Sequence, residues 1–257
     1  MDKNNQIKLG QVFLQSKSVV KKIIQAAEVS PTDLILEIGP GLGILTEELV
    51  KSAKEVTAIE IDPKLVDLLE KKFTGISNLK IILGDIRHFN FNQYFPAEKK
   101  FKITANIPYY LTSYLIQTLL TLNNPPQLIV LMVQKEIAER ITAHSPQSNF
   151  LSTLVNFFTQ PKIISIINKD LFKPKPKVDS AIIKLFPIKK RNKEEIEKFL
   201  KLLKIGFAHP RKKLINNLKA IQPKIYWQKV FTELNLPIDT RPGNLAVQDW
   251  QELKKRL

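Results

Sequence analysis

Short apolar runs and amphipathic stretches alternate along the first two thirds of the chain. Five runs have the length and composition of buried strands: 34–38, 55–59, 79–83, 101–105 and 128–133. Apolar residues recur at helical spacing in the segments between them (44–50, 63–73, 113–122 and 135–143), and a further helix is expected at 18–27. Strands that alternate with helices form βαβ units, so the pattern predicts an α/β fold with a mostly parallel sheet.

The pattern changes near residue 188. Before it, a helix is expected at 150–158 and strands at 162–167 and 181–186. After it, three basic amphipathic helices are expected at 193–205, 211–220 and 224–234, interrupted by Pro210, Pro223 and Pro237. We therefore predict two domains, an α/β domain over 1–188 and a small α-helical domain over 189–257.

Charge separates the two predicted domains further. The 257 residues include 40 Lys+Arg against 24 Asp+Glu, a formal net charge of +16. Residues 189–257 contain 17 basic and 7 acidic residues, so 17 − 7 = +10 lies in the last quarter. An AT-rich genome would raise lysine throughout the chain, whereas this charge is concentrated. The distribution favours a nucleic acid as partner.

Several classes of site and location are disfavoured by composition. The chain has no cysteine, hence no disulfide and no thiolate nucleophile, and its three histidines lack the spacing of metal ligands. The longest apolar run, 128–133, is too short to span a bilayer, and the first residues have no apolar signal region. We expect a cytoplasmic protein with no membrane segment and no metal.

Three of the eight glycines follow the first predicted strand, at Gly39, Gly41 and Gly43. Glycines at a strand-to-helix junction let the backbone approach a ligand closely. Acids end the next two strands, Glu60 for a ribose and Asp85 for an amino group, at the edge where such folds bind ligands. Gly43 comes one residue earlier than the third glycine of a dinucleotide-binding loop, and Glu37 lies two residues before Gly39. This arrangement favours an S-adenosylmethionine site over hydride chemistry.

The segment Asn106-Ile107-Pro108-Tyr109-Tyr110 follows the fourth predicted strand. It offers a carboxamide oxygen, a carbonyl held extended by the next proline, and an aromatic ring. A nucleobase with an exocyclic amine needs two acceptors for its hydrogens and a ring on which to stack. Asn and Pro also dominate turns, so the segment alone leaves an ordinary turn open.

Motifs in a fixed order carry a resemblance to a known family. The chain resembles the ribosomal RNA adenine N6,N6-dimethyltransferases of the small-subunit, kasugamycin-resistance type over roughly residues 8–257. The matching segments are 10–14, 37–43, Glu60, 84–85, 106–110, 133–136, 172–181, 211–218 and 241–245.

The resemblance implies a Rossmann-like class I methyltransferase domain with a helical C-terminal domain. The implied reaction is S-adenosylmethionine-dependent dimethylation of two adjacent adenosines near the 3′ end of 16S rRNA, by a monomer. Implied contacts to S-adenosylmethionine are Val12, Leu14, Gly39, Glu60, Asp85 and Asn106; implied catalytic residues are Asn106, Pro108, Tyr109 and Phe172; and implied RNA contacts are Arg211, Lys212 and Lys213.

A departure at Val12 and several alternatives accompany this resemblance. Val12 stands where the family usually has Asn or His, so its contact depends on the backbone. An erythromycin-resistance-type enzyme, acting on a large-subunit adenine, would share the pocket. A DNA adenine methyltransferase usually carries a second proline in place of Ile107. An idle RNA-binding assembly factor would be expected to lose Glu60, Asp85 or Asn106, and all three are present.

Overall fold

The computed structural model describes residues 12–106, 111–188 and 192–257. The chain divides into two compact units. Unit 1 extends to Ala138 and takes in Lys162–Pro187, and unit 2 consists of Glu139–Pro161 and Ile188–Leu257. The candidate chemistry predicted from the strand ends lies in unit 1.

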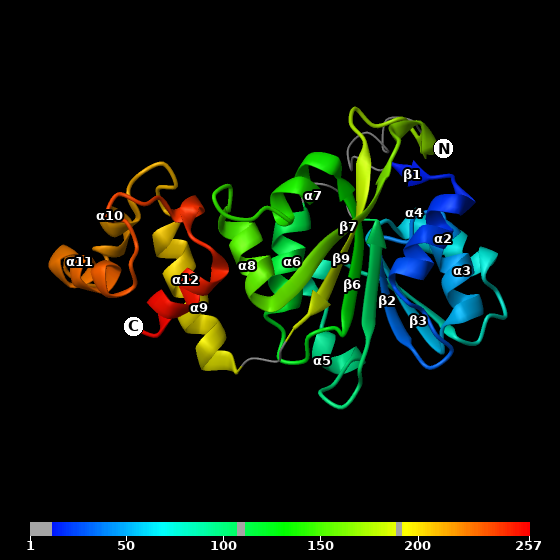
Figure 1. Cartoon of the computed structure of the whole chain (residues 1–257). Helices are drawn as coiled ribbons and strands as arrows, with labels where there is room; N and C mark the ends of the chain where they lie inside the picture. The colour runs from blue at the N-terminus through cyan, green and yellow to red at the C-terminus, as the bar shows by residue number, and fades with distance from the viewer. Residues whose placement is uncertain (1–11, 107–110, 189–191) are drawn as a thin grey trace. The chain divides into compact units, whose positions relative to one another are not determined.

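A seven-stranded sheet in the order β4-β3-β2-β5-β6-β9-β7 forms the centre of unit 1. Strands β2, β3, β4, β5 and β6 pair in parallel, and β9 runs antiparallel to β6. Figure 1 shows helices α2 and α3 on one face of the sheet and α6 on the other. The strand bounds are β2 Leu34–Ile38, β3 Glu55–Glu60, β4 Leu79–Leu83, β5 Lys102–Asn106, β6 Leu128–Gln134, β7 Thr159–Ile167 and β9 Ser180–Pro187.

Helices and a small second sheet complete this unit. The two-stranded sheet pairs β1, Phe13–Leu14, with β8, Phe172–Lys173. The helices are α2 Lys17–Ala26, α3 Ile44–Ser52, α4 Pro63–Lys72, α5 Phe91–Tyr94, α6 Thr112–Leu120 and α7 Lys135–Ile141, and short 3-10 turns span Ile86–His88 and Lys169–Leu171.

Local sequence explains where these elements begin and which face they bury. Helix α4 begins after Asp62, whose carboxylate accepts from the Lys64 amide at 2.9 Å, with Pro63 in the first helical position. Helix α2 buries Val19, Val20 and Ile23 in a cluster with residues of β2, β6 and β9. The apolar positions recur every three to four residues, which gives the helix one buried face.

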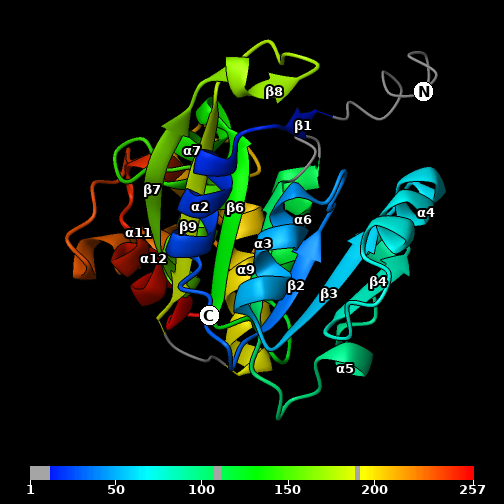
Figure 2. The ribbon, with the colours of Figure 1, turned by 90° about the vertical axis from the view of Figure 1, so that its right-hand side faces the viewer.

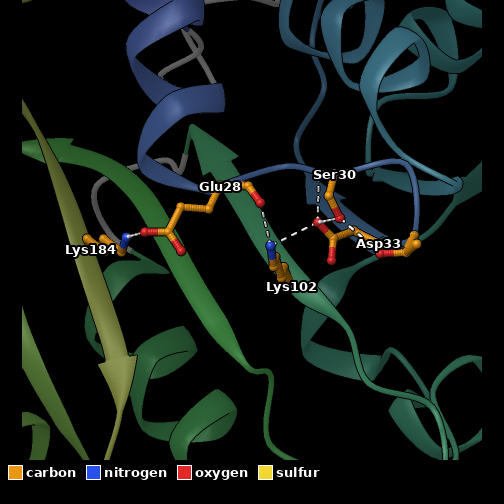
Figure 3. A network of polar contacts seen from close by, with 6 residues as sticks. Glu28, Ser30, Asp33, Lys102 and Lys184 are labelled. Atoms are coloured by element: carbon orange, nitrogen blue, oxygen red, sulfur yellow. Dashed lines mark hydrogen bonds and ion pairs between the residues drawn. The ribbon is translucent and has the colours of Figure 1, made fainter.

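Polar contacts join the turn after α2 to two strands (Figure 3). The Lys102 ammonium donates to the Asp33 carboxylate at 2.8 Å and to the Glu28 carbonyl at 2.6 Å. Asp33 also accepts from the amide and the hydroxyl of Ser30, at 2.7 and 2.9 Å. Lys184 on β9 pairs with the Glu28 carboxylate at 2.5 Å. These contacts tie β2, β5 and β9 together at the edge of the sheet where β2 and β5 begin.

Unit 2 is helical and packs around aromatic rings. Phe157 stacks on Phe199 with ring centroids 3.5 Å apart, and Phe207 stacks on Trp250 at 5.2 Å. The buried Asn217 side chain donates to the carbonyls of residues 206 and 209, at 2.6 and 3.1 Å. The helices are α8 Phe150–Phe158, α9 Lys193–Gly206, α10 Leu214–Leu218, α11 Lys224–Glu233 and α12 Val247–Lys254, with a 3-10 turn at Pro242–Asn244.

The structure confirms most expected elements and corrects others. All seven expected strands form, within one to three residues of their expected ends. The helix expected at 211–220 was too long, because α10 begins only at Leu214, whose amide donates to the Thr240 carbonyl. Helix α12 was not expected. Residues 139–161, expected in the first domain, cluster with unit 2, where Phe157 of α8 stacks on α9. None of the helices in the described ranges is long and apolar enough to cross a membrane.

Candidate active site

The glycine loop, residues 39–43, connects β2 to α3. Gly41 and Gly43 have φ values of +59° and +75°, a region that side-chain-bearing residues rarely adopt. A Cβ on Gly41 would lie 3.1 Å from the Phe13 ring, and one on Gly43 would lie 2.8 Å from both Leu69 and Phe73. The loop therefore requires glycine for its conformation and for its close contact with Phe13 of β1.

Glu60, the last residue of β3, places a buried carboxylate beside this loop. One oxygen accepts from the amides of Ile61 and Asp62, at 2.8 and 3.1 Å, and the other accepts from the Gly41 amide at 3.2 Å. Burial raises the pKa of Glu60, and these three N–H groups oppose the rise. Both lone pairs of Oε1 are taken and one remains on Oε2, so Glu60 can still accept a hydrogen bond from a ligand at Oε2.

Glu37 on β2 is a second buried carboxyl group in the wall of the same cavity. The Thr46 hydroxyl donates to its Oε2 atom at 2.7 Å. Burial raises the pKa of Glu37 to about 8, against the weaker opposing effect of Thr46. A carboxyl group with this pKa is neutral at pH 7. A cation bound beside it would favour its ionised form.

Asp85 follows β4 and caps the 3-10 turn at 86–88. The Arg87 guanidinium donates to both carboxylate oxygens, from Nε at 3.1 and 2.8 Å, and the Arg87 amide donates to Oδ1 at 2.9 Å. These contacts hold the pKa of Asp85 below its usual range. Arg87 was not predicted from the sequence, although its place two residues after an acid that ends a strand is the signal that could have indicated it.

Asn106 ends β5, next to β2 in the sheet, so its side chain reaches the same edge as the glycine loop. Its Nδ2 atom donates to the Val12 carbonyl at 3.5 Å. Val12 thus contacts a predicted site residue through its backbone, and its predicted backbone contact to S-adenosylmethionine stays a prediction. Ile107, Pro108, Tyr109 and Tyr110 lie outside the described residues.

The small sheet of β1 and β8 brings Phe172 to this edge. Leu14 pairs with Phe172 and Phe13 with Lys173. Phe172 is only 5% exposed and belongs to the buried cluster under β1. It therefore serves as both a core residue and a wall of the cavity. Neither short strand was expected, because two-residue strands leave no periodic signal.

These groups line one cavity of about 130 Å³ in unit 1. Its acidic wall suits a cationic ligand such as S-adenosylmethionine, and its apolar wall suits a nucleobase. Among the residues predicted from the sequence, the cavity is lined by Val12, Leu14, Glu37, Gly39, Gly41, Glu60, Asp85, Asn106 and Phe172, and it is also lined by Phe13, Ile61 and Arg87.

The predicted RNA contacts are not part of this cavity. Arg211, Lys212 and Lys213 belong to unit 2, where all three are exposed just before α10. The Lys212 amide donates to the His209 carbonyl at 3.1 Å, so a turn precedes the helix. Their side chains are free to face a large polyanion.

The comparisons with known proteins agree over nearly the whole chain. The model of a family described as ribosomal RNA adenine dimethylase matches residues 2–257. A protein from Dehalococcoides mccartyi named ribosomal RNA small subunit methyltransferase A is 40% identical over 251 residues, covering 95% of this chain and 86% of its own. One of the same name from Pediococcus pentosaceus is 34% identical, covering 97% and 88%.

Solved structures give the same answer for the fold. A dimethyladenosine transferase from Plasmodium falciparum has a TM-score of 0.80 and 30% identity, over 94% of this chain and 95% of its own. A 23S rRNA methyltransferase, ErmE, has a TM-score of 0.76 and 25% identity, over 95% and 99%. With a family model that spans the chain and relatives at this identity, the protein belongs to the ribosomal RNA adenine dimethylase family.

Proposed function

We propose that this protein is an S-adenosylmethionine-dependent dimethyltransferase that converts two adjacent adenosines near the 3′ end of 16S rRNA to N6,N6-dimethyladenosine. The observation that carries the proposal is the position of the Asn106 carboxamide in the wall of the cavity that the glycine loop and Glu60 also line. A hydrogen-bond acceptor for the amine of a nucleobase therefore lies at the same edge of the sheet as residues suited to bind a nucleoside. The chain that carries them is a member of the rRNA adenine dimethylase family.

The acidic residues would hold the methyl donor. S-adenosylmethionine, when bound, supplies an electrophilic methyl group on a positively charged sulfur. Beyond its three backbone donors Glu60 has acceptor capacity left on Oε2 for one ribose hydroxyl, and a second hydroxyl would have to replace one of those donors. Glu37 would face the cationic amino-acid end, and Asp85, held in place by Arg87, would accept from the adenine amino group.

The target amine would be held by Asn106. Because Nδ2 donates to Val12, Oδ1 is the atom left to accept an N6 hydrogen of the target adenine. The Ile107 carbonyl would accept the second hydrogen, Pro108 would restrict that carbonyl, and Tyr109 would stack on the base. With both hydrogens held, the N6 lone pair is turned out of conjugation toward the methyl carbon.

The chemistry then depends on position more than on acid–base groups. The N6 nitrogen forms a bond to the methyl carbon as the carbon–sulfur bond breaks, and the nitrogen then loses a proton to water. Holding the two reactants in line supplies most of the acceleration such a reaction needs. Phe172 would close one side of the base pocket and keep water away from the reacting atoms.

The target base must leave its stack to enter the cavity, which costs a few kcal/mol. Arg211, Lys212 and Lys213 would compensate by contacting RNA phosphates, so binding should weaken steeply with salt. We expect the protein to act as a monomer in the cytoplasm, on the small ribosomal subunit or its precursor.

The large-subunit alternative rests on one observation, the similarity in fold to ErmE. Its sequence identity, 25%, is lower than the 34–40% of the relatives named for the small subunit. An idle assembly factor is disfavoured because Glu60, Asp85 and Asn106 are all retained in the cavity wall.

Methyl transfer to each ribosomal substrate tests the proposal. Purified protein should transfer labelled methyl groups to under-methylated small subunits, two per target adenosine. Protein-free large-subunit RNA serves as the competing substrate. Transfer to that RNA with none to small subunits would support the resistance-type reaction instead.

A further inference from the structure

A lysine-rich loop lies beside the cavity and has no place in the site described above. Residues 173–177, the basic loop, read Lys-Pro-Lys-Pro-Lys and connect β8 to the segment before β9. Figure 2 shows β1 and β8 beyond the upper ends of β2 and β6, at the edge of the sheet where the cavity residues gather.

The loop is held firmly at its first end. Phe172, directly before it, is buried in the cavity wall and pairs with Leu14 across the small sheet. The Gln15 amide donates to the Leu171 carbonyl at 3.0 Å, which extends the pairing by one residue. Because side chains alternate along a strand, Phe172 faces inward while Lys173 faces solvent.

The loop is held at its second end as well. The Asp179 carboxylate accepts from the Lys169 amide at 3.0 Å, and the Asp179 carbonyl accepts from the Lys135 amide at 3.0 Å. Pro174 and Pro176 each fix one backbone dihedral between these ends. The backbone positions of the lysines are therefore set before any ligand arrives, which lowers the backbone entropy lost on binding.

The charges of this loop are only partly compensated. Lys175 forms an ion pair with Asp170. The ammonium groups of Lys173 and Lys177 are exposed and have no ion-pair or hydrogen-bond partner in the ranges that the structure describes. Two unpaired ammonium groups thus lie on the loop that follows Phe172 of the cavity wall, and ammonium groups bind phosphate oxygens well as point charges.

We propose that Lys173 and Lys177 bind the RNA phosphates that flank the target adenosine. The inference rests on the proposed function, since a base that enters the cavity leaves its own phosphates at the rim. The basic loop is then a second RNA contact, in unit 1 and separate from Arg211, Lys212 and Lys213. It positions the nucleotide being methylated.

The test replaces both lysines in the full-length protein, as Lys173→Gln/Lys177→Gln. The matched control is Lys54→Gln/Lys99→Gln, which removes two exposed lysines near the starts of β3 and β5, at the opposite edge of the sheet. Binding is measured to under-methylated small subunits over a range of salt concentrations. We expect affinity about tenfold below the control and a log–log salt slope smaller by about 1.4, the value for two phosphates of a single strand.

A synthetic RNA locates the contact. The phosphates on either side of the target adenosines are replaced by uncharged methylphosphonates. Wild-type protein should lose about tenfold in affinity for this RNA, and the Lys173→Gln/Lys177→Gln variant should lose less than twofold. Equal losses for both proteins, or binding by the variant equal to that of the control, would overturn the inference.

Further measurements distinguish this role of the lysines from a structural role, and distinguish failure of this inference from failure of the proposed function. The melting temperature and the affinity for S-adenosylmethionine should not change in the glutamine variant. Lys173→Arg/Lys177→Arg should restore binding, because arginine also binds phosphate. If wild-type protein methylates small subunits while the salt slopes match, only the loop inference fails; if it methylates nothing, the proposed function fails and the binding result still judges the loop.

Discussion

The Asn106 side chain donates to the Val12 carbonyl at 3.5 Å, which joins the end of β5 to the segment leading into β1. The contact occupies Nδ2 and so determines which way the carboxamide faces. Oδ1 is left as an acceptor in a cavity that Glu60 and the glycine loop also line. A valine at position 12 can serve here because the backbone, not the side chain, makes the contact.

Replacing Asn106 should abolish turnover without abolishing RNA binding. Asn106→Ala removes the acceptor for N6, and losing one hydrogen-bonding group aimed at the reacting centre typically costs about 100- to 1,000-fold in kcat. Single-turnover methylation of small subunits measures the effect, with filter binding to the same subunits. Asn92→Ala, which replaces an exposed asparagine of helix α5, is the control and should keep its activity. Full activity in Asn106→Ala would refute the proposed pocket.

Gly41 and Gly75 both have a positive φ, so their alanine variants can distinguish the effect of backbone strain from the effect of a contact in the site. Gly41 (φ +59°) and Gly75 (φ +83°) both adopt conformations that cost alanine about 1–2 kcal/mol. A Cβ on Gly75 meets no atom within 4 Å, whereas one on Gly41 crowds Phe13 in the cavity wall. Gly41→Ala should lose at least as much stability in urea as Gly75→Ala, because its Cβ also crowds Phe13, and only Gly41→Ala should bind S-adenosylmethionine more weakly, by about tenfold or more. Calorimetric titration measures this, and equal affinities in both variants would contradict it.

The sheet and the location of the site were predictable from sequence because both leave periodic signals. Apolar runs identified β2 to β6, and the residues at or just after their ends, Glu60, Asp85 and Asn106, line one cavity as expected for parallel strands. These strands and site residues could be predicted without knowing which distant parts of the chain contact each other.

The contacts that arrange these residues were not predictable in the same way. Strands β1 and β8 are two residues each, and they pair across more than 150 positions in sequence. Arg87 beside Asp85 and Thr46 beside Glu37 depend on how a turn and a helix start place side chains. Similarly, a basic pattern predicted helix at Arg211, where the chain instead forms a turn held by Asn217.

The network around Lys102 should contribute measurably to stability (Figure 3). Lys102 and Asp33 are each only 14% exposed, so their ion pair is poorly screened by water. Lys102→Met would leave Asp33 with its two Ser30 donors and without a cation, and should cost about 1–3 kcal/mol in urea unfolding. Lys51→Met breaks exposed pairs only, which water and salt screen, and should lower stability by much less than Lys102→Met does. Equal losses would mean that the network contributes no more than a surface pair.

Glu37 should make the unliganded protein less stable as pH rises from about 5 to 8. Burial raises its pKa from 4.5 to about 8, so in this window the folded protein binds a proton that the unfolded chain has released. Stability then falls with pH, by up to ~1.4 kcal/mol per pH unit from this group, and levels off above the folded pKa. The Asp85 and Asp33 carboxyl groups, whose pKa values are lowered, act in the opposite direction at lower pH, outside this window.

The variant that isolates this effect is Glu37→Gln, which stays neutral and can still accept from Thr46. Its melting temperature should change less than that of wild type between pH 5.5 and 8, and should exceed it at pH 8.5. Glu48→Gln, which replaces a partly exposed carboxyl group on the helix α3 that also carries Thr46, should follow the wild-type curve. Because Glu60 also has a raised pKa, some slope should remain in Glu37→Gln. Parallel curves for wild type and Glu37→Gln would show that Glu37 is already ionised in the folded protein without a bound cation, and would contradict the raised pKa.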